Sequence, residues 1–574
     1  NAVFRNRGKG GLLIVSLWLS AISFVYTAAW IIIGFLISVL LAYILREKKS
    51  LSDFFHYLWG YLWRGLVAAG LSAFRWLPSM QMLLHSAQYT ERDIEKTLFW
   101  SVEGYHDMIL RFFSNNSFGV TANNVLGYNY YEQIMLASTI LSMAFLFHNM
   151  IVRKGKERIF SVACGCLVLV AVGTKAGALL FNLGKDLTFR WTFLLIFGFI
   201  LNFAFAFEDV MEQGRKRWAL VLIEFIAVGG ILYISFQRLY KVYGASMTDG
   251  DLAVSVMTYR LCKGLLLIYI LAFVFLCFIK GETQKTAVSL CIFGIICVEV
   301  SALNYPTLNI NRIALPKAGA YTMDYFSPGS TYAIQTVKTK DPGIYRMERT
   351  LICGGNDPLM MDYYGTFSYG IHGSEIGEFY QANGLNDDNG DFTSRIAGNP
   401  VLESLLGVKY MLSVEPLNEY GYQEVDQISV FNEAINQEDA WIVNENQFAF
   451  PIIYMTSPEN AKTIERMLGG EYNAGEVENL LQCIQGINIS SFQESSIAGS
   501  INSTEKGLLL TSIPFDEGWQ IYIDGARMET KSVNHGFIGT DISEGEHTVL
   551  LRYTPRGLYL GLFISLMKIG RAHV

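Results

Sequence analysis

The sequence predicts a polytopic α-helical membrane domain, followed by an extracytoplasmic α/β and β-sandwich region and one C-terminal transmembrane helix. The 574 residues are 51% apolar and only 17% charged, whereas soluble domains average about 25% charged. Residues 304–555 hold 33 acidic and 14 basic residues, a net charge of −19, and the rest holds 18 and 30, a net charge of +12. Neither composition suggests nucleic-acid binding, so we expect no nucleic-acid partner.

Five segments follow from these composition changes. We expect a membrane domain of about nine spans at 1–303, an extracytoplasmic α/β domain at 304–500, a β-sandwich domain at 501–556, a shortened last transmembrane helix at 557–567 and an artefact at 568–574. The last segment, KIGRAHV, resembles a translated sequencing adapter. Because the chain starts with Asn1 in mid-loop, we also expect a fragment that lacks upstream spans.

The first apolar run, Leu12 to Leu45, is too long for one span. Its 34 residues would form a helix of about 51 Å, against a hydrocarbon core of about 30 Å. Two short spans that reverse near Tyr26 to Trp30 fit better. Basic residues flank the run on both sides, which places both of its ends in the cytoplasm by the positive-inside rule.

A third span, at about Gly60 to Leu84, contains two arginines and a proline. Arg64 and Arg75 are eleven residues apart, nearly three helical turns, so they share one face before a kink at Pro78. One interpretation is that the two side chains snorkel to opposite membrane surfaces. The other is that Arg75 faces an anionic headgroup.

The next loop, His85 to Tyr130, contains an amphipathic segment that is expected to lie as a helix in the membrane interface. Its polar face carries residues at i, i+4 and i+8, with His106 beside them: Glu103, Asp107 and Arg111. This face is either solvated, with local ion pairs, or a catalytic or sugar-binding surface.

Further spans are expected at 131–149, 158–181, 191–207, 218–236, 262–279 and 286–303. The basic loops Arg153–Arg158 and Glu208–Arg217 mark the cytoplasmic side, and Lys175 is expected to snorkel near the outer end of its span. The loop Phe181–Phe193 is then external. It carries Lys185, Asp186 and Arg190, and its Trp191 and Phe193 are suited to the membrane interface.

The region after residue 304 shows two clear local patterns. Asn399–Ser413 reads as a short helix, a glycine stop and a strand. Alternating apolar residues around Trp519 and Leu551, with Asp524-Gly525 as a turn, predict an antiparallel sheet in a small sandwich whose core includes Trp519.

The sequence predicts no metal site and does not establish a disulfide. The calcium-like run Asp387–Asp391 lacks a glycine at its sixth position, and His372, His535 and His547 have no partners at ligand spacing. Six of the eight cysteines lie in or beside apolar runs. The other two, Cys353 and Cys483, leave a disulfide possible in principle, but two positions do not establish it.

Five blocks in a fixed order resemble the bacterial YfhO membrane-protein family over nearly the whole chain. They are LSAFRWLP (Leu71–Pro78), RWTF (Arg190–Phe193), YRMER with NDPLMM (Tyr345–Met361), LESLLGVKYMLS (Leu402–Ser413), and the closing run from IPFDEGWQIYIDG to GEHTVLLRYTPRGLYLG. The chain departs from the family at Gly370–Ser374, where His372 replaces an expected Tyr-Ser pair.

The family is similar to the GT-C glycosyltransferases, polytopic enzymes that take a sugar from a polyprenyl-phosphate carrier outside the membrane. The resemblance implies a GT-C-like fold and transfer of a sugar to a cell-envelope polymer such as lipoteichoic acid. It implies three partners: membrane lipid, the polyprenyl-phosphate sugar donor and the polymer acceptor. A catalytic Asp is expected in a first outer loop that this chain does not contain, and no cofactor is assigned.

In the mechanism that this implies, a carboxylate accepts the acceptor's proton and a cation stabilises the departing phosphate. The candidate substrate-binding residues are Arg190, Lys185, Asp186, Arg75, Glu103, Asp107 and Arg111. Arg190 is either the phosphate contact or an interfacial anchor beside Trp191. The alternatives to an enzyme are a lipid-sugar transporter and an envelope scaffold with a polymer-binding outer domain.

Overall fold

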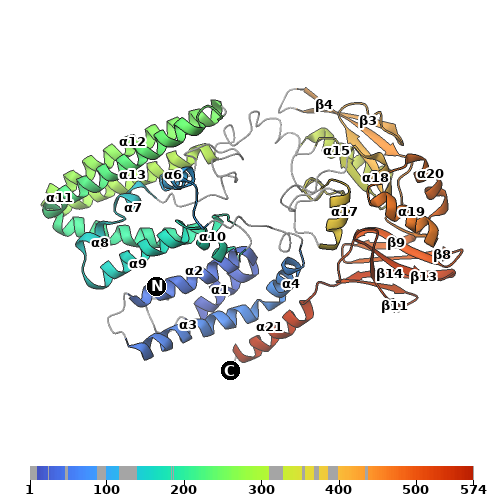
Figure 1. Cartoon of the computed structure of the whole chain (residues 1–574), viewed down its shortest axis with the longest axis horizontal. Helices are drawn as coiled ribbons and strands as arrows, with labels where there is room; N and C mark the ends of the chain where they lie inside the picture. The colour runs from blue at the N-terminus through green and yellow to red at the C-terminus, as the bar shows by residue number, and fades with distance from the viewer. Residues whose placement is uncertain are drawn as a thin grey trace. The chain divides into compact units, whose positions relative to one another are not determined.

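The computed structural model describes residues 10–23, 25–44, 50–86, 98–114, 139–182, 184, 187–247, 249–308, 327–351, 356–366, 374–385, 398–432 and 437–572. The chain divides into two compact units (Figure 1). The helical unit comprises 1–72, 94–318 and 565–574, and the sheet unit comprises 73–93 and 319–564.

Apolar helices make up the helical unit. They are α1 (Gly10–Ser23), α2 (Val25–Ile44), α3 (Leu51–Leu71), α6 (Val102–Arg111), α7 (Ile140–Ala144), α8 (His148–Val152), α9 (Gly155–Ala171), α10 (Lys175–Phe181), the 3₁₀ turn η2 (Arg190–Thr192), α11 (Phe193–Tyr243), α12 (Asp249–Phe278) and α13 (Glu282–Leu308). The first apolar run forms two helices in contact, α1 and α2, as predicted.

Three helices among the described residues are long and apolar enough to cross a membrane: Arg190–Tyr243, Leu252–Phe278 and Glu282–Tyr305. The pair α9 and α10, bent by 89°, counts as a fourth if it is one broken span. The number of about nine spans therefore stays a prediction.

Helix α11 is a folded pair of helices. Its 51 residues would extend about 76 Å if straight, but Gln213 has non-helical angles (φ −116°, ψ 18°). Phe203 and Phe225 both contact the ring of Phe145, with centroids 5.9 and 5.6 Å away, although 22 residues correspond to about 33 Å of straight helix. The chain therefore reverses near Gln213, between the two spans predicted at 191–207 and 218–236.

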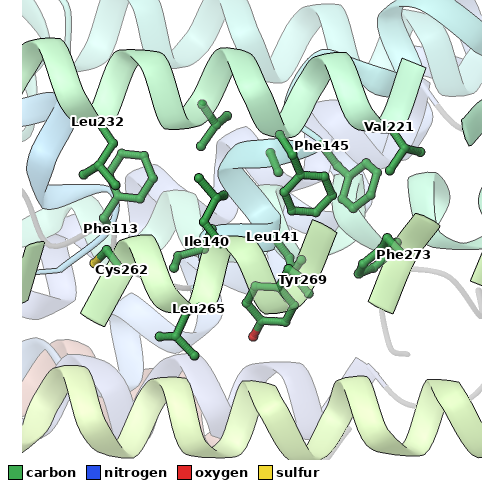
Figure 2. Packing of buried hydrophobic residues seen from close by; sticks show 14 of the residues in the cluster. Phe113, Ile140, Leu141, Phe145, Val221, Leu232, Cys262, Leu265, Tyr269 and Phe273 are labelled. Carbon is green, nitrogen blue, oxygen red and sulfur yellow. The ribbon is translucent and has the colours of Figure 1, made fainter. Parts of the chain in front are cut away.

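The core of the helical unit lies where α6, α7, both halves of α11 and α12 meet (Figure 2). Phe145 is fully buried at its centre and also contacts Phe273, with ring centroids 5.1 Å apart. Between helices in lipid, such packing stabilises through van der Waals contact rather than through exclusion of water.

The predicted third span is interrupted at Ser72, not at Pro78. The Ser72 hydroxyl donates to the carbonyls of Ala68 and Ala69, which satisfies the last turn of α3. Helix α4 (Ala73–Leu84) then starts in the sheet unit, with Pro78 inside it. The prediction that Arg64 and Arg75 share one face of a continuous helix is therefore wrong.

The sheet unit contains three sheets and their covering helices. Its further elements are α15 (Pro328–Lys340), β1 (Arg346–Arg349), α16 (Asp357–Met360), η3 (Ser374–Ile376), α17 (Gly377–Ala382), α18 (Pro400–Leu405), β2 (Val408–Ser413), β3 (Tyr422–Asn432), β4 (Gln437–Asn446), β5 (Ile453–Thr456), α19 (Pro458–Leu468), α20 (Ala474–Cys483), β6 (Gln485–Gly486), β7 (Asn488–Gln493), β8 (Ser496–Ser503), β9 (Gly507–Pro514), β10 (Trp519–Ile523), β11 (Ala526–Met528), β12 (Lys531–Val533), β13 (Phe537–Ile542) and β14 (Gly545–Tyr553).

A four-stranded sheet, in the order β1-β2-β4-β3, packs against α15. Two five-stranded sheets, β11-β10-β14-β8-β7 and β12-β13-β9-β5-β6, enclose one apolar core as a sandwich. The sandwich strands begin at Ile453, earlier than the predicted segment 501–556. Helices α19 and α20 separate β5 from β6, so the local pattern did not reveal that β5 belongs to the sandwich.

Several local predictions are confirmed. Helix α18 ends before Gly407, whose φ of +74° allows the stop, and β2 follows. Asp524 and Gly525 both have positive φ, as a two-residue hairpin turn requires. Trp519, however, is only half-buried, at the sandwich edge beside Tyr553. Helix α21 (Leu558–Ala572) follows the sandwich and continues through residues 568–572.

Candidate functional site

The loop between α10 and α11 is fixed by aromatic stacking. The rings of Phe181 and Trp191 are parallel, with centroids 3.9 Å apart and an interplanar angle of 4°. The indole of Trp30 donates to the Phe181 carbonyl over 3.0 Å. Trp191 is fully buried, so its predicted place at the membrane interface is wrong, whereas Phe193 is 42% exposed. The packing holds η2, and therefore Arg190, in a defined position.

Arg190 is the candidate residue that this loop presents best. It is partly buried, at the first position of η2 and directly before the buried Trp191. Lys185 and Asp186, predicted to act with it, lie outside the described residues. A guanidinium in such partly desolvated surroundings binds a phosphate more strongly than one in open water.

A second cation, Lys175, belongs to the same neighbourhood. Its ammonium lies 5.3 Å from the centroid of the Trp100 ring, and that ring contacts Phe189 at 5.1 Å, next to Arg190 in sequence. Lys175 is only 4% exposed, so the expected snorkelling is wrong. The sequence signal was present, since a lysine within an apolar run requires an explanation.

Helix α6 packs against other helices of the helical unit, and its predicted place in the membrane interface stays a prediction. Trp100 donates to the carbonyl of Val172, and Tyr105 to that of Gly173, where α9 and α10 break. Its apolar face therefore satisfies backbone carbonyls that the break leaves open.

The polar face of α6 forms ion pairs and a hydrogen bond. Glu103 pairs with Arg238 of α11 over 2.7 Å, and His106 hydrogen-bonds Ser235. Asp107 and Arg111 pair over 2.9 Å with side chains that are fully buried. The predicted solvated face with local ion pairs is therefore confirmed only in part: the local pair Asp107–Arg111 forms but is buried, whereas Glu103 pairs with a half-exposed Arg238. The amphipathic pattern was real, but its polar side meets polar groups of α11.

An apolar groove of about 140 Å³ lies between α2, α9 and the first half of α11. On α2, Gly34, Ser38 and Ala42 recur every four residues, so they share one face and leave room along it. The groove is otherwise lined by aliphatic and aromatic side chains. It extends from Phe160 in α9 to Phe181, at the start of the loop that carries Arg190.

Arg75 lies in the sheet unit, so the structure does not group it with the other candidates. It lines a cleft of about 240 Å³, here called the Arg75 cleft, together with His85, Glu375, Asp516, Glu517, Tyr553 and Arg556. Arg556 pairs with Glu517 over 2.7 Å. Burial and the Asp516 carboxylate raise the pKa of Tyr553 to about 12, so its hydroxyl stays protonated. The cleft is lined by two arginines and three carboxylates.

Sequence reasoning missed a buried charged network in the helical unit. His148 is fully buried and hydrogen-bonds two carboxylates, Glu224 at 3.0 Å and Asp209 at 3.2 Å. Arg217 also binds Asp209, over 2.6 Å. Residues 148, 209 and 224 are too far apart in sequence for any motif to connect them.

Among the residues that the structure describes, no group of three or more His, Cys, Asp or Glu side chains could hold a metal ion. His547 instead pairs with Asp524 over 2.6 Å, and His535 contacts the carbonyl of Glu465. The calcium-like run at 387–391, His372 and Cys353 lie outside the described residues, and Cys483 is a free, exposed cysteine.

A family model for the bacterial membrane protein YfhO matches residues 3–465 and 474–565. The chain belongs to the YfhO family. No curated protein and no solved structure matches it. Family membership and the long apolar helices together identify a membrane protein.

The structure shows what one of the resembling blocks, YRMER with NDPLMM, does. In YRMER and NDPLMM, Arg349 and Asp357 form a fully buried ion pair with two hydrogen bonds, of 2.7 and 2.6 Å. Tyr363 donates a third bond to Asp357. Arg346, from the same strand, donates to Ser512 in the sandwich, at 2.6 Å to its hydroxyl and 2.8 Å to its carbonyl. This block holds the four-stranded sheet against the sandwich.

Proposed function

We propose that this YfhO-family protein is a membrane glycosyltransferase. It moves a sugar from a polyprenyl-phosphate carrier to a cell-envelope polymer such as lipoteichoic acid, on the outer face of the membrane. The sheet unit is proposed to be extracytoplasmic, because the basic loops Arg153–Arg158 and Glu208–Arg217 favour the cytoplasm.

The observation that carries this proposal is an apolar groove that reaches Phe181, whose ring stacks on Trp191, the residue that follows Arg190. A polyprenyl phosphate joins a long apolar chain to an anionic head. The apolar groove suits the chain, and the positive charge of Arg190 suits the phosphate. A dry cavity of about 150 Å³ admits a benzene-sized group, so the groove holds a short segment of the chain. The rest of the carrier stays in lipid.

Arg190 is proposed to bind the carrier phosphate and to stabilise it as charge builds on the leaving group. Lys175, buried nearby under the Trp100 ring, adds a second positive charge to this region. Glu103 and Asp107 are each paired with an arginine. We therefore assign neither of them as the base that accepts the acceptor's proton.

Crosslinking with a polyprenyl phosphate that carries a photoreactive group in its chain tests the groove. The expected result is labelling of peptides from α2 and α9. Ser38→Leu fills the groove and should lower both labelling and sugar transfer roughly tenfold, a loss of about 1.4 kcal/mol in binding. Ser16→Leu, at an exposed position on α1, is the matched control. Full labelling of the Ser38→Leu protein would contradict the proposal.

A second candidate function, a lipid-sugar transporter, is favoured by the buried network of His148, Asp209, Glu224 and Arg217. Ionisable groups inside a membrane bundle often serve ion or proton pathways. Proteoliposomes separate the two functions. The transporter would replace the transferase if the lipid-linked sugar crosses the bilayer, if Glu224→Gln abolishes that movement, and if no sugar is transferred to an acceptor.

A further inference from the structure

A large cleft in the sheet unit separates the four-stranded sheet from the sandwich. We call it the Tyr364 cleft; its volume is about 640 Å³, within the range of about 300–1,000 Å³ typical of ligand sites. One wall contains the segment Asp341–Met347 and residues around α16, and the other contains Ile452, Phe492, Glu494 and Ile513. It lies entirely within one unit and is distinct from the Arg75 cleft.

The two walls are firmly connected. Arg346 spans them through its bonds to Ser512 and to the carbonyl of Leu406. The ring of Tyr364 meets that of Phe492 edge to face, with centroids 5.3 Å apart. The backbone of Tyr364 is fixed in turn, since its carbonyl accepts from the amide of Met347 over 2.7 Å. The cleft is therefore already shaped before any ligand binds.

The lining combines exposed aromatic rings with polar groups of both signs. Tyr364 is 53% exposed, and Tyr345 and Phe492 are half-buried. Lys338 and Asp362 form an exposed ion pair at the rim, over 2.8 Å. Aromatic faces accept the C–H faces of sugar rings, while amide, carboxylate and ammonium groups exchange hydrogen bonds with hydroxyls.

Charge decides which saccharide fits. Of the ionisable side chains that line the cleft, three are acidic (Asp341, Asp362, Glu494) and two are basic (Lys338, Arg346). The region 304–555 carries a net charge of −19. A polyanionic chain would therefore be repelled, whereas an uncharged chain pays no such penalty.

We propose that the Tyr364 cleft binds an uncharged oligosaccharide, with Tyr364 and Phe492 as stacking platforms. Binding itself does not require the transfer reaction. Only the role of the bound sugar, as the uncharged part of the acceptor, rests on the proposed glycosyltransferase function.

The test titrates the full chain in detergent with two probes, a neutral gluco-oligosaccharide of seven units and an oligomer of glycerol phosphate. Calorimetry should detect the first and not the second. Tyr364→Ala should weaken binding at least tenfold. Tyr332→Ala removes a similarly exposed ring (57%) from α15, outside the cleft, and should leave binding unchanged.

Amine acylation gives a readout that does not depend on substitution. The neutral probe should protect Lys338, at the cleft rim, and should not protect Lys340, two residues later on the same helix. Binding of glycerol phosphate alone, or equal reactivity of Lys338 with and without the sugar, would overturn the proposal. The binding assay contains no sugar donor, so absence of oligosaccharide binding leaves the proposed transferase function untouched. Conversely, absence of sugar transfer with intact oligosaccharide binding would overturn only the transferase function.

Discussion

The apolar groove of the helical unit and the Tyr364 cleft of the sheet unit are hollows of opposite chemistry. The groove is small, about 140 Å³, and is made by missing side chains on one face of α2. The cleft is larger, about 640 Å³, and lies where two sheets meet under aromatic rings and charges. One therefore suits a hydrocarbon chain, and the other a hydroxylated one.

Under the two proposals above, the groove takes the lipid part of the donor and the cleft takes the uncharged part of the acceptor. Helices in lipid create space by using small residues, because their backbones already pack closely. Sheets in water create space where two of them meet, and polar rims keep that space hydrated. The proposed enzyme needs both kinds of hollow, and the predictions below test each of them.

Membrane sidedness is the largest expected effect, because labelling is all or none. In a background without native cysteines, a Cys at position 462 in the sheet unit should react with an impermeant maleimide added outside intact cells. A Cys at position 154, in a basic loop, should react only after lysis. Both starting residues are exposed lysines, Lys462 and Lys154, so the comparison is matched. The reversed pattern would place the cleft on the wrong side of the membrane for envelope polymers.

The buried Arg349–Asp357 pair, beside the wall of the Tyr364 cleft, gives the largest effect on stability. Asp357→Asn removes the carboxylate that pairs with a buried guanidinium, a change that typically costs about 3–5 kcal/mol. Asp362→Asn, in the exposed pair with Lys338, should cost less than about 1 kcal/mol. Thermal unfolding followed by tryptophan fluorescence measures both. Equal losses would mean that the buried pair does not hold the wall.

Arg190→Lys tests the polar end of the groove. Lysine keeps the charge and anchors equally well, but it cannot make the planar two-point contact with a phosphate. Sugar transfer should therefore fall by one to two orders of magnitude, since a lost charge-assisted contact costs roughly 1.5–3 kcal/mol. Expression and insertion should be unchanged. The control is Arg64→Lys, because Arg64 donates to the Gly60 carbonyl of its own helix and lies 6.0 Å from the Tyr61 ring. Wild-type transfer would return Arg190 to the role of an anchor.

Local features could be predicted from the sequence because their causes are local. The stop at Gly407 and the turn at Asp524-Gly525 depend on residues that tolerate positive φ, and the reversal between α1 and α2 follows from length. The position of Arg190 between two apolar helices was readable in the same way.

Long-range features could not be predicted, since no pattern specifies the partner. Helix α6 reads as amphipathic whether its polar face meets water or Arg238, and only the fold decides. The bond from Arg346 to Ser512 crosses 166 residues, and Arg75 lies in a different unit from Arg190. Trp191 shows the same limit, because an interfacial and a buried tryptophan have the same sequence neighbours.

Glu403 tests whether the cleft walls respond to pH. It lies fully buried in α18, where its carboxylate accepts from Tyr422 and from the amide of Gly398, and burial raises its pKa to about 7. The residue after this helix is Leu406, and its carbonyl accepts a hydrogen bond from Arg346 in the cleft wall.

The folded state therefore holds a proton that the unfolded state, with an ordinary glutamate pKa near 4.5, releases. The stabilising contribution is complete below about pH 4.5 and is lost as pH rises through about 7, at up to roughly 1.4 kcal/mol per pH unit. The Asp524 carboxylate raises the pKa of His547, which also loses stabilisation as pH rises. The relevant quantity is thus the difference between wild type and Glu403→Gln, which should grow in favour of the variant from pH 5 to pH 8. Parallel melting curves across that range would show that Glu403 ionises normally and that α18 does not couple pH to the cleft.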